Sequence, residues 1–168
     1  MPTLEPTEYL STMAQVPTPV TIVTTLDTNG RPWGFTAGSF TSLSLDPPLV
    51  LVCPAKTASC HQAFTTGDRF LINVLATQHT DIAHNFARPG HDKFTNSGMQ
   101  PSELGLPGLP DATARIACTL HNVLDGGDHS ILIGHVEAVS HTHDTPLVYH
   151  NRNYTQPAHT KTLATTPS

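Results

Sequence analysis

Proline and glycine interrupt this chain too often for a bundle of long helices. The 168 residues include 15 prolines and 11 glycines, and only 12% of the residues are charged. This composition favours many short strands joined by turns. The length is typical of one domain, and no linker-like segment divides it. We therefore expect a single domain over residues 1–168.

Alternating β-branched and apolar residues predict the strands. Residues 20–26 and an extended segment over 33–45 flank the turn DTNGRP, which predicts a hairpin that ends at Pro47 and Pro48. The apolar run LVLVC, residues 49–53, predicts a buried central strand. Further strands are expected over residues 69–75, 113–124, 130–140 and 146–151. Six or more strands with short helices favour a closed or nearly closed antiparallel barrel.

Three short helices are expected. Pro6 or Thr7 opens the first and Pro17 closes it, and residues 58–64 supply one or two helical turns. The third covers residues 79–87, with Thr80 as a candidate cap. One of its faces is apolar and holds Ile82, Ala83, Phe86 and Ala87. A loop rich in glycine and proline follows over residues 88–110.

Charge and hydropathy exclude several classes of protein. The formal net charge of −5 provides no basic field for nucleic acid or for an anionic membrane. The longest apolar run is far short of the roughly 20 residues that span a bilayer, and the acidic N-terminus lacks the basic start of a signal peptide. We expect a soluble cytoplasmic protein. Its three cysteines, Cys53, Cys60 and Cys118, are expected to be thiols.

Eleven histidines raise the question of a metal site. His141 and His143 would share a strand face, but the chain has no HxxxH helix motif and no carboxylate pair that completes a ligand set. We predict no metal site, with a histidine-based metal-binding barrel as the rival from another class. Neither GxGxxG nor GxxxxGK[ST] occurs, so a nucleotide would have to bind without a Rossmann or P-loop cradle.

The segment 34–45 concentrates hydroxyl side chains around a glycine. Strict alternation fails there, because Gly38 interrupts the pattern of hydroxyl and apolar residues. A glycine inside a strand indicates either a bulge or a place where a ligand approaches the backbone. The hydroxyls belong to Thr36, Ser39, Thr41, Ser42 and Ser44, and they also fit the solvent face of a plain strand.

Two further segments each have a functional and a plain interpretation. Lys56 follows a buried strand, and Thr57, Ser59 and Cys60 begin the next helix. Hydroxyls, a cation and free amides suit a phosphate monoester, although a capped helix without a ligand looks the same. The turn DGGDH at residues 125–129 is either a simple hairpin turn or a rim that presents His129 to a ligand.

Four ordered runs together resemble the flavin reductase family, which has the FMN-binding split β-barrel fold. They are GFTAGSFTSLSLDPPLVLVC, DRFLINVLATQHTDIAHNFARPGHDKF, GLPGLPDATARIACTLHNVLDGGDHSILIGHVEAV and PLVYHNRNY, and they cover about residues 9–154. Within the family, the chain is similar to the reductase components of two-component flavin-dependent monooxygenases, especially those of aromatic polyketide pathways of the actinorhodin type. The resemblance implies a mainly β, Greek-key-like antiparallel barrel with short helices, and a disordered tail over residues 155–168.

The resemblance also implies an activity and its partners. The expected enzyme is an NAD(P)H-dependent flavin oxidoreductase that uses NADH or NADPH to reduce FMN or FAD. Reduced flavin would diffuse to a separate oxygenase, and the reductase would be a homodimer. The alternative is a flavoprotein of the same fold that retains its flavin and reduces or binds another small molecule.

Individual positions acquire expected roles from the same resemblance. Thr36, Ala37, Gly38, Ser39 and Phe40 would surround the flavin ring, and His129 would be the catalytic residue that contacts the nicotinamide. The remaining cofactor-binding positions would be Cys53, Lys56, Thr57, Ser59, Cys60, Ala87, Lys93, Asp128 and Tyr154, with Lys56 and Lys93 near the phosphate. Gly38 replaces a usual asparagine, and Ala58 and Cys60 replace a usual serine and threonine, which implies weaker flavin binding.

Overall fold

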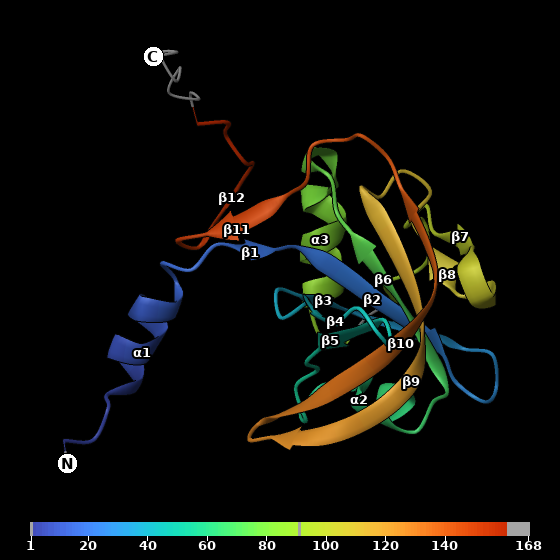
Figure 1. Cartoon of the computed structure of the whole chain (residues 1–168), viewed down its shortest axis with the longest axis horizontal. Helices are drawn as coiled ribbons and strands as arrows, with labels where there is room; N and C mark the ends of the chain where they lie inside the picture. Colours follow the sequence, from blue (N-terminus) through green and yellow to red (C-terminus); the bar gives the residue numbers. More distant parts are fainter. Residues whose placement is uncertain (1, 91, 161–168) are drawn as a thin grey trace.

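The edges of the main sheet explain the shape of the molecule. In the computed structural model, which describes residues 2–90 and 92–160, seven strands pair in the order β3-β2-β6-β9-β10-β5-β4 (Figure 1). The two edge strands, β3 and β4, are consecutive in the chain, so residues 38–40 alone link one edge to the other. The result is the expected split antiparallel barrel. Its strands are β2 (Thr21–Leu26), β3 (Pro32–Ala37), β4 (Thr41–Ser44), β5 (Leu49–Val52), β6 (Arg69–Val74), β9 (Ala114–Gly126) and β10 (His129–His141).

Strand β2 is buried on both faces although half of its residues are threonines. Each threonine hydroxyl donates a hydrogen bond to a backbone carbonyl: Thr21 to Ala37 at 2.8 Å, Thr24 to Pro107 at 2.6 Å and Thr25 to Arg69 at 2.7 Å. Buried hydroxyls without partners would cost free energy, so these bonds make the polar residues compatible with the core. They also attach β2 to three other parts of the chain.

Strands β9 and β10 form the long hairpin that the sequence predicts. They pair from His129 opposite Gly126 to His141 opposite Ala114, and Gly127 in the turn has a φ of 77°. Gly134 lets the barrel wall approach its core. A Cβ at this position would lie 2.6 Å from Cζ of Phe70 and 2.7 Å from Cβ of Cys118, closer than packed carbon atoms come.

The structure corrects three details of the predicted elements. The extended segment 33–45 is two strands, because β3 pairs with β2 whereas β4 pairs with β5. Strand β5 lies next to the edge, and its side chains alternate between buried Val50 and Val52 and half-buried neighbours, so it is not a central strand. Thr80 is the first residue of its helix, the N-cap position belongs to His79, and no side chain caps the end.

Short helices cover the barrel. Helix α2 (His61–Thr65) buries Phe64, and α3 (Thr80–Ala87), which follows the 3-10 turn η1 (Thr77–His79), buries Ala83 and Phe86. Phe86 lies so close to β3 that a Cβ on Gly34 would be 2.8 Å from its ring. The expected loop over residues 88–110 contains β7 (Gln100–Pro101), η2 (Glu103–Gly105) and β8 (Pro107–Gly108). No helix of the described residues is long and apolar enough to cross a membrane.

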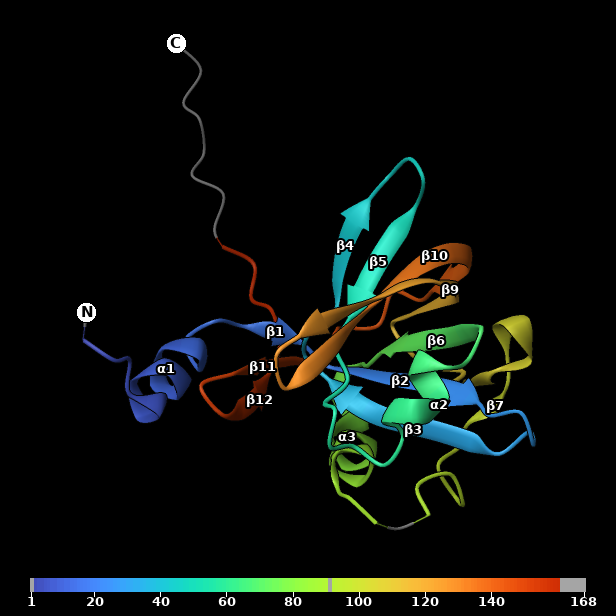
Figure 2. The same ribbon diagram turned by 90° about the horizontal axis from the view of Figure 1, so that it is seen from below.

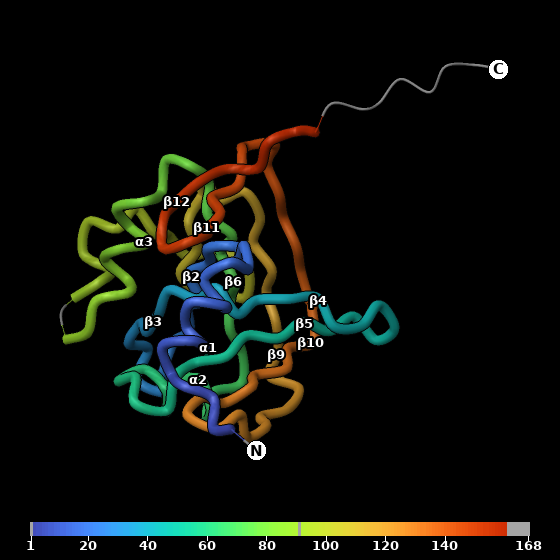
Figure 3. Tube along the Cα trace, turned by 90° about the vertical axis from the view of Figure 1, so that its left-hand side faces the viewer, coloured from blue at the N-terminus to red at the C-terminus, as the bar shows by residue number. Residues whose placement is uncertain are grey.

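A second, smaller sheet extends from the barrel beside the first helix. It consists of β1 (Thr18–Pro19), β11 (Val148–His150) and β12 (Asn153–Thr155), and α1 (Pro6–Met13) precedes it (Figure 2). We call these four elements the arm. Helix α1 begins at Pro6 as predicted but buries none of its residues. Figure 3 shows α1 in front of the barrel, and the tip of the β4–β5 hairpin extending to one side.

The expected C-terminal tail begins later than predicted. Thr155, its first residue, is the last residue of β12. Residues 156–160 belong to no helix or strand, and residues 161–168 lie outside the described residues. The expected disorder of this tail stays a prediction.

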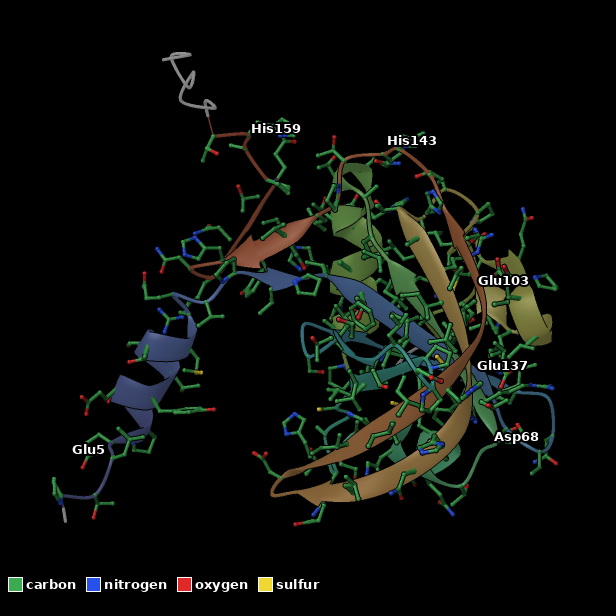
Figure 4. All side chains as sticks on the ribbon, in the orientation of Figure 1. Glu5, Asp68, Glu103, Glu137, His143 and His159 are labelled. Carbon is green, nitrogen blue, oxygen red and sulfur yellow. The ribbon has the colours of Figure 1, made fainter. Side chains whose placement is uncertain are left out.

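One ion pair joins the long loop to the barrel and makes stability depend on pH. Glu103 in η2, labelled in Figure 4, accepts hydrogen bonds from Nε and Nη2 of Arg115 in β9 at 2.9 and 3.0 Å. Both side chains are largely buried, at 17% and 18% exposure. The Arg115 hydrogen bonds, and secondarily the Ser102 hydroxyl, lower the pKa of Glu103 from its ordinary value of 4.5 to about 2.

We expect this carboxylate to stabilise the fold fully above pH 4.5 and to lose that effect as the pH falls toward 2. The loss should be roughly 1 to 2 kcal/mol of unfolding free energy, since water still screens part of the pair. Urea denaturation at successive pH values measures it. Glu103→Gln is the control, because its unfolding free energy should lack this acid-dependent component. An equally steep acid loss in that variant would assign the effect to other carboxylates.

Candidate functional site

A cavity of about 620 Å³ opens where β3 leaves the sheet. Four parts of the chain line it: the end of β3 with the residues after it, the segment between β5 and α2, the end of α3 with the loop that follows, and the start of β10. It brings together most of the residues that the sequence predicts for binding the flavin and the nicotinamide. These are Thr36, Ala37, Gly38, Ser39, Cys53, Thr57, Ser59, Cys60, Ala87, Lys93 and His129.

The segment after β3 is held in place by its own hydroxyl groups. Thr36 Oγ1 donates to the carbonyl of Ala83 in α3 at 2.7 Å, and Ser39 Oγ accepts from the amide of Cys53 at 3.0 Å. The two hydroxyls are therefore structural, and the segment meets the cavity between these anchors. At Gly38, an added Cβ would lie 2.8 Å from Thr18 Oγ1, so a larger side chain would collide with β1 instead of filling the cavity.

The turn before α2 provides donors without partners. Within residues 2–90 and 92–160, the amides of Thr57 and Ser59 donate to no other group, and neither do their hydroxyls, whereas the amide of Cys60 faces its own thiol. All three residues line the cavity. Polar groups left unpaired around a concave site fit an anionic or strongly accepting ligand. The Cys60 thiol is buried, and this burial raises its pKa.

Lys93 supplies the cation of the cavity. Its Nζ donates to the carbonyl of Phe86, in the last turn of α3, at 3.0 Å. An ammonium has three donors, so two remain for a ligand. Burial lowers the pKa of Lys93, and the nearby Cys60 acts in the opposite direction. A partly desolvated ammonium of this kind interacts more strongly with an anion than an exposed one does.

His129 enters the cavity from the β9–β10 turn. Its Nδ1 lies 2.7 Å from Oδ1 of Asp128, and its side chain is 45% exposed. The His129 hydrogen bond lowers the pKa of Asp128, which favours a carboxylate that holds a proton on Nδ1. Nε2 is then the ring atom left for a ligand.

Four predicted site residues lie outside this cavity. Lys56 forms an ion pair with Asp125 on the β9–β10 hairpin, so its ammonium is directed to the protein itself. Asp128 reaches the cavity only through His129. Phe40 packs against the main core cluster. Tyr154 belongs to the arm, where its ring lies 5.4 Å from Tyr149 and 5.0 Å from His84.

Sequence reasoning missed the apolar side of the cavity. Phe35 and Phe86 line it, together with Ala55, Ala58, Pro89 and Gly90. Phe86 lies on the predicted apolar face of α3 and is buried there, and it also borders the cavity. The Pro-Gly pair directly after that helix was a usable signal, because turns at helix ends often border binding sites.

The described residues contain no cluster of three or more histidine, cysteine, aspartate or glutamate side chains placed to hold a metal ion. The rings of His141 and His143 are 6.1 Å apart and contact each other edge to face. The cavity instead combines an apolar wall, unpaired amides and one cation. This set suits a flat aromatic ring that carries a polar edge and a phosphate.

Comparison with known proteins agrees with this geometry. The sequence profile of the flavin reductase like domain matches residues 13–158. The chain belongs to this flavin reductase family. The match covers the barrel and the small sheet of the arm and begins at the last residue of α1. It confirms the resemblance and the fold predicted from sequence.

Members of the flavin reductase family with curated names include close relatives of this chain. It is 41% identical over 142 residues to the stachydrine N-demethylase reductase subunit of Rhizobium meliloti, covering 84% of this chain and 62% of the relative. It is 42% identical over 144 residues to the actinorhodin polyketide dimerase of Streptomyces coelicolor, covering 84% and 81%. The chain spans 62% and 45% of the lengths of two relatives from Rhizobium meliloti.

Among solved structures of flavin reductases, one holds both kinds of ligand. The NADH:FAD oxidoreductase of Streptomyces globisporus, in complex with NAD and FAD fragments, superposes with a TM-score of 0.86 at 31% identity, covering 94% of this chain and 98% of that one.

Proposed function

We propose that this chain is an NAD(P)H:flavin oxidoreductase that releases reduced flavin to a separate monooxygenase. The observation that carries the proposal is the cavity in which an apolar wall, the unpaired backbone amides of Thr57 and Ser59, and the Lys93 ammonium surround one space. Flavin, when bound, supplies the acceptor for hydride from the nicotinamide. The protein then has to hold and align two rings rather than supply an acid or base.

Each group of residues has a role in this proposal. The backbone of residues 36–39 faces the polar edge of the ring, and Phe35 and Phe86 contribute apolar surface. Thr57, Ser59, the amide of Cys60 and Lys93 hold the phosphate. His129 positions the nicotinamide through Nε2, with Asp128 fixing its tautomer. Use of NAD(P)H also fits the cytoplasmic location expected from the sequence.

A steady-state assay tests this function directly. Purified protein should oxidise NADH or NADPH only when FMN, FAD or riboflavin is added. Dialysis should then remove the flavin and leave the protein colourless. No flavin-dependent oxidation of either nicotinamide would refute the proposal. Flavin retained through dialysis, with electrons passing to another acceptor, would support the alternative of a flavoprotein that keeps its cofactor.

We also propose that two copies associate through the arm. The arm exposes apolar side chains that nothing in the described chain covers, including Leu10 at 59%, Met13 at 44% and Tyr149 at 41% exposure. A groove lined by these residues runs between α1 and the small sheet. An unpartnered helix that buries no residue of its own gains stability by packing against a second copy.

Leu10→Asp should therefore convert a dimer into a monomer, because a carboxylate in an apolar interface is costly. Sedimentation velocity measures the mass in solution, and we expect the dissociation constant to rise by about a hundredfold or more. Ser11→Asp on the same helix is the matched control and should remain dimeric. A wild-type protein that sediments as a monomer would contradict the proposed dimer, and a Leu10→Asp dimer would place its interface elsewhere.

A further inference from the structure

A second cavity continues from the candidate flavin site. It has a volume of about 550 Å³ and shares Ser59, Cys60, Gly90 and Lys93 with the first cavity. Its other side is formed by Arg31, by the first three residues of β3, and by Asp92 and Phe94. Three of the shared residues, Ser59, Cys60 and Lys93, are among those to which we assign the flavin phosphate, so the second cavity begins where FMN would end.

The second cavity contains a preformed aromatic stack. The guanidinium carbon of Arg31 lies 4.4 Å from the centre of the Trp33 ring, and both residues line the cavity. The indole is fixed because Nε1 of Trp33 donates to Oδ2 of Asp27 at 3.0 Å. The backbone of Arg31 is fixed too, since its amide donates to Oδ1 of the same carboxylate at 3.0 Å. Guanidinium planes that stack on one aromatic ring readily stack on a nucleobase.

Charge in the second cavity favours an anion close to this stack. Among the described residues that line it, Arg31 and Lys93 are cations and Asp92 is the one carboxylate. Oδ1 of Asp92 accepts hydrogen bonds from the amides of Phe94 and Thr95 at 2.9 and 3.3 Å, and Oδ2 accepts from the Thr95 hydroxyl. The carboxylate is thus used to shape its own turn. The ammonium of Lys93 stands between the two cavities, where a pyrophosphate would cross from one to the other.

We propose that the second cavity is an adenylate subsite, and that FAD is the flavin this chain binds most tightly. The proposal rests on the proposed flavin reductase function and adds the substrate it prefers. Lys93 would bind the pyrophosphate and Arg31 would stack on the adenine. The nicotinamide dinucleotide is the less suitable occupant, because no residue of the β9–β10 hairpin, which carries His129, lines the second cavity.

Equilibrium binding of FAD and FMN, followed by quenching of flavin fluorescence, tests the subsite without relying on turnover. Wild-type protein should bind FAD at least about tenfold more tightly than FMN, the increment expected from one stacked base. Arg31→Ala and Arg31→Lys should each remove most of that difference, and FMN binding should change less than twofold. The lysine variant keeps the charge and loses the planar group, so it separates stacking from attraction and replaces the alanine variant if that one fails to fold.

Arg69→Ala is the matched control, because Arg69 is an exposed arginine that lines neither of the two cavities. It should leave FAD and FMN binding unchanged. Equal wild-type affinities for FAD and FMN would overturn the proposal. So would an Arg31→Ala variant that binds FAD normally and shows a raised KM for NADH, since the cavity would then serve the nicotinamide dinucleotide. Preferential FAD binding without any NAD(P)H oxidation would instead refute the proposed function and leave the subsite standing.

Discussion

Lys93→Met is expected to weaken FMN binding by roughly ten- to a hundredfold while riboflavin binding changes less than twofold. Methionine keeps the length of the side chain and removes the ammonium, so the loss reports the charge-assisted hydrogen bonds to the phosphate, which are worth about 1.5 to 3 kcal/mol. Isothermal titration with each flavin measures the two affinities. FMN and riboflavin losing the same affinity would mean that Lys93 supports the cavity without touching the phosphate.

Lys56→Met provides the matched control. The sequence places Lys56 near the phosphate as well, but the structure pairs its ammonium with Asp125 on the hairpin, outside the cavity. We therefore expect Lys56→Met to leave FMN binding within about twofold of wild type, because exposed ion pairs of this kind contribute little. A large and selective loss of FMN in this variant would restore the sequence-based assignment.

His129→Ala is expected to lower kcat/KM for the nicotinamide by roughly five- to a hundredfold, the effect of losing one hydrogen bond of about 1 to 3 kcal/mol. KM should rise because a binding contact is lost, and kcat should fall because the two rings align less well. Flavin affinity should change little. Steady-state kinetics at saturating flavin, with flavin binding measured separately, distinguishes these quantities.

His121→Ala is a suitable control for that experiment, since His121 is an exposed histidine on the same hairpin that does not line the cavity. Its kinetics should match wild type. If His129→Ala keeps normal nicotinamide kinetics, or loses flavin instead, the histidine belongs to a different subsite from the one assigned.

Local sequence patterns predicted where the strands of this fold lie better than they predicted which strands pair with each other. The turns at residues 27–32 and 125–129 were recognisable because they separate two β-branched segments. The strands flanking each turn pair as predicted, although the first hairpin ends at Ala37. Nothing in the segment 33–45 shows that β3 and β4 pair with different strands, because periodicity describes one strand at a time. The barrel was predicted from the resemblance to a family. The end of β3 and the start of a separate strand after residues 38–40 became visible only in the structure.

The candidate site, too, was predictable from the sequence only in part. The residues that line the cavity through their backbone were predictable from a conspicuous glycine and from free amides before a helix. The orientation of a long side chain was not, because Lys56 is directed by Asp125, 69 positions away in the sequence. The stack of Arg31 on Trp33 also escaped notice, since the two residues looked like the end of a hairpin turn and the beginning of a strand.

The anchoring of residues 36–39 affects how a flavin would be held. Thr36 ties one side of the segment to α3, and Ser39 ties the other side to the residue after β5. The conformational entropy of this segment is therefore lost when the protein folds, and little remains to be lost when a ligand arrives. A preordered segment of this kind can bind and release a flavin in every turnover without changing its conformation. The residence time of the flavin is then set by the groups that hold its phosphates.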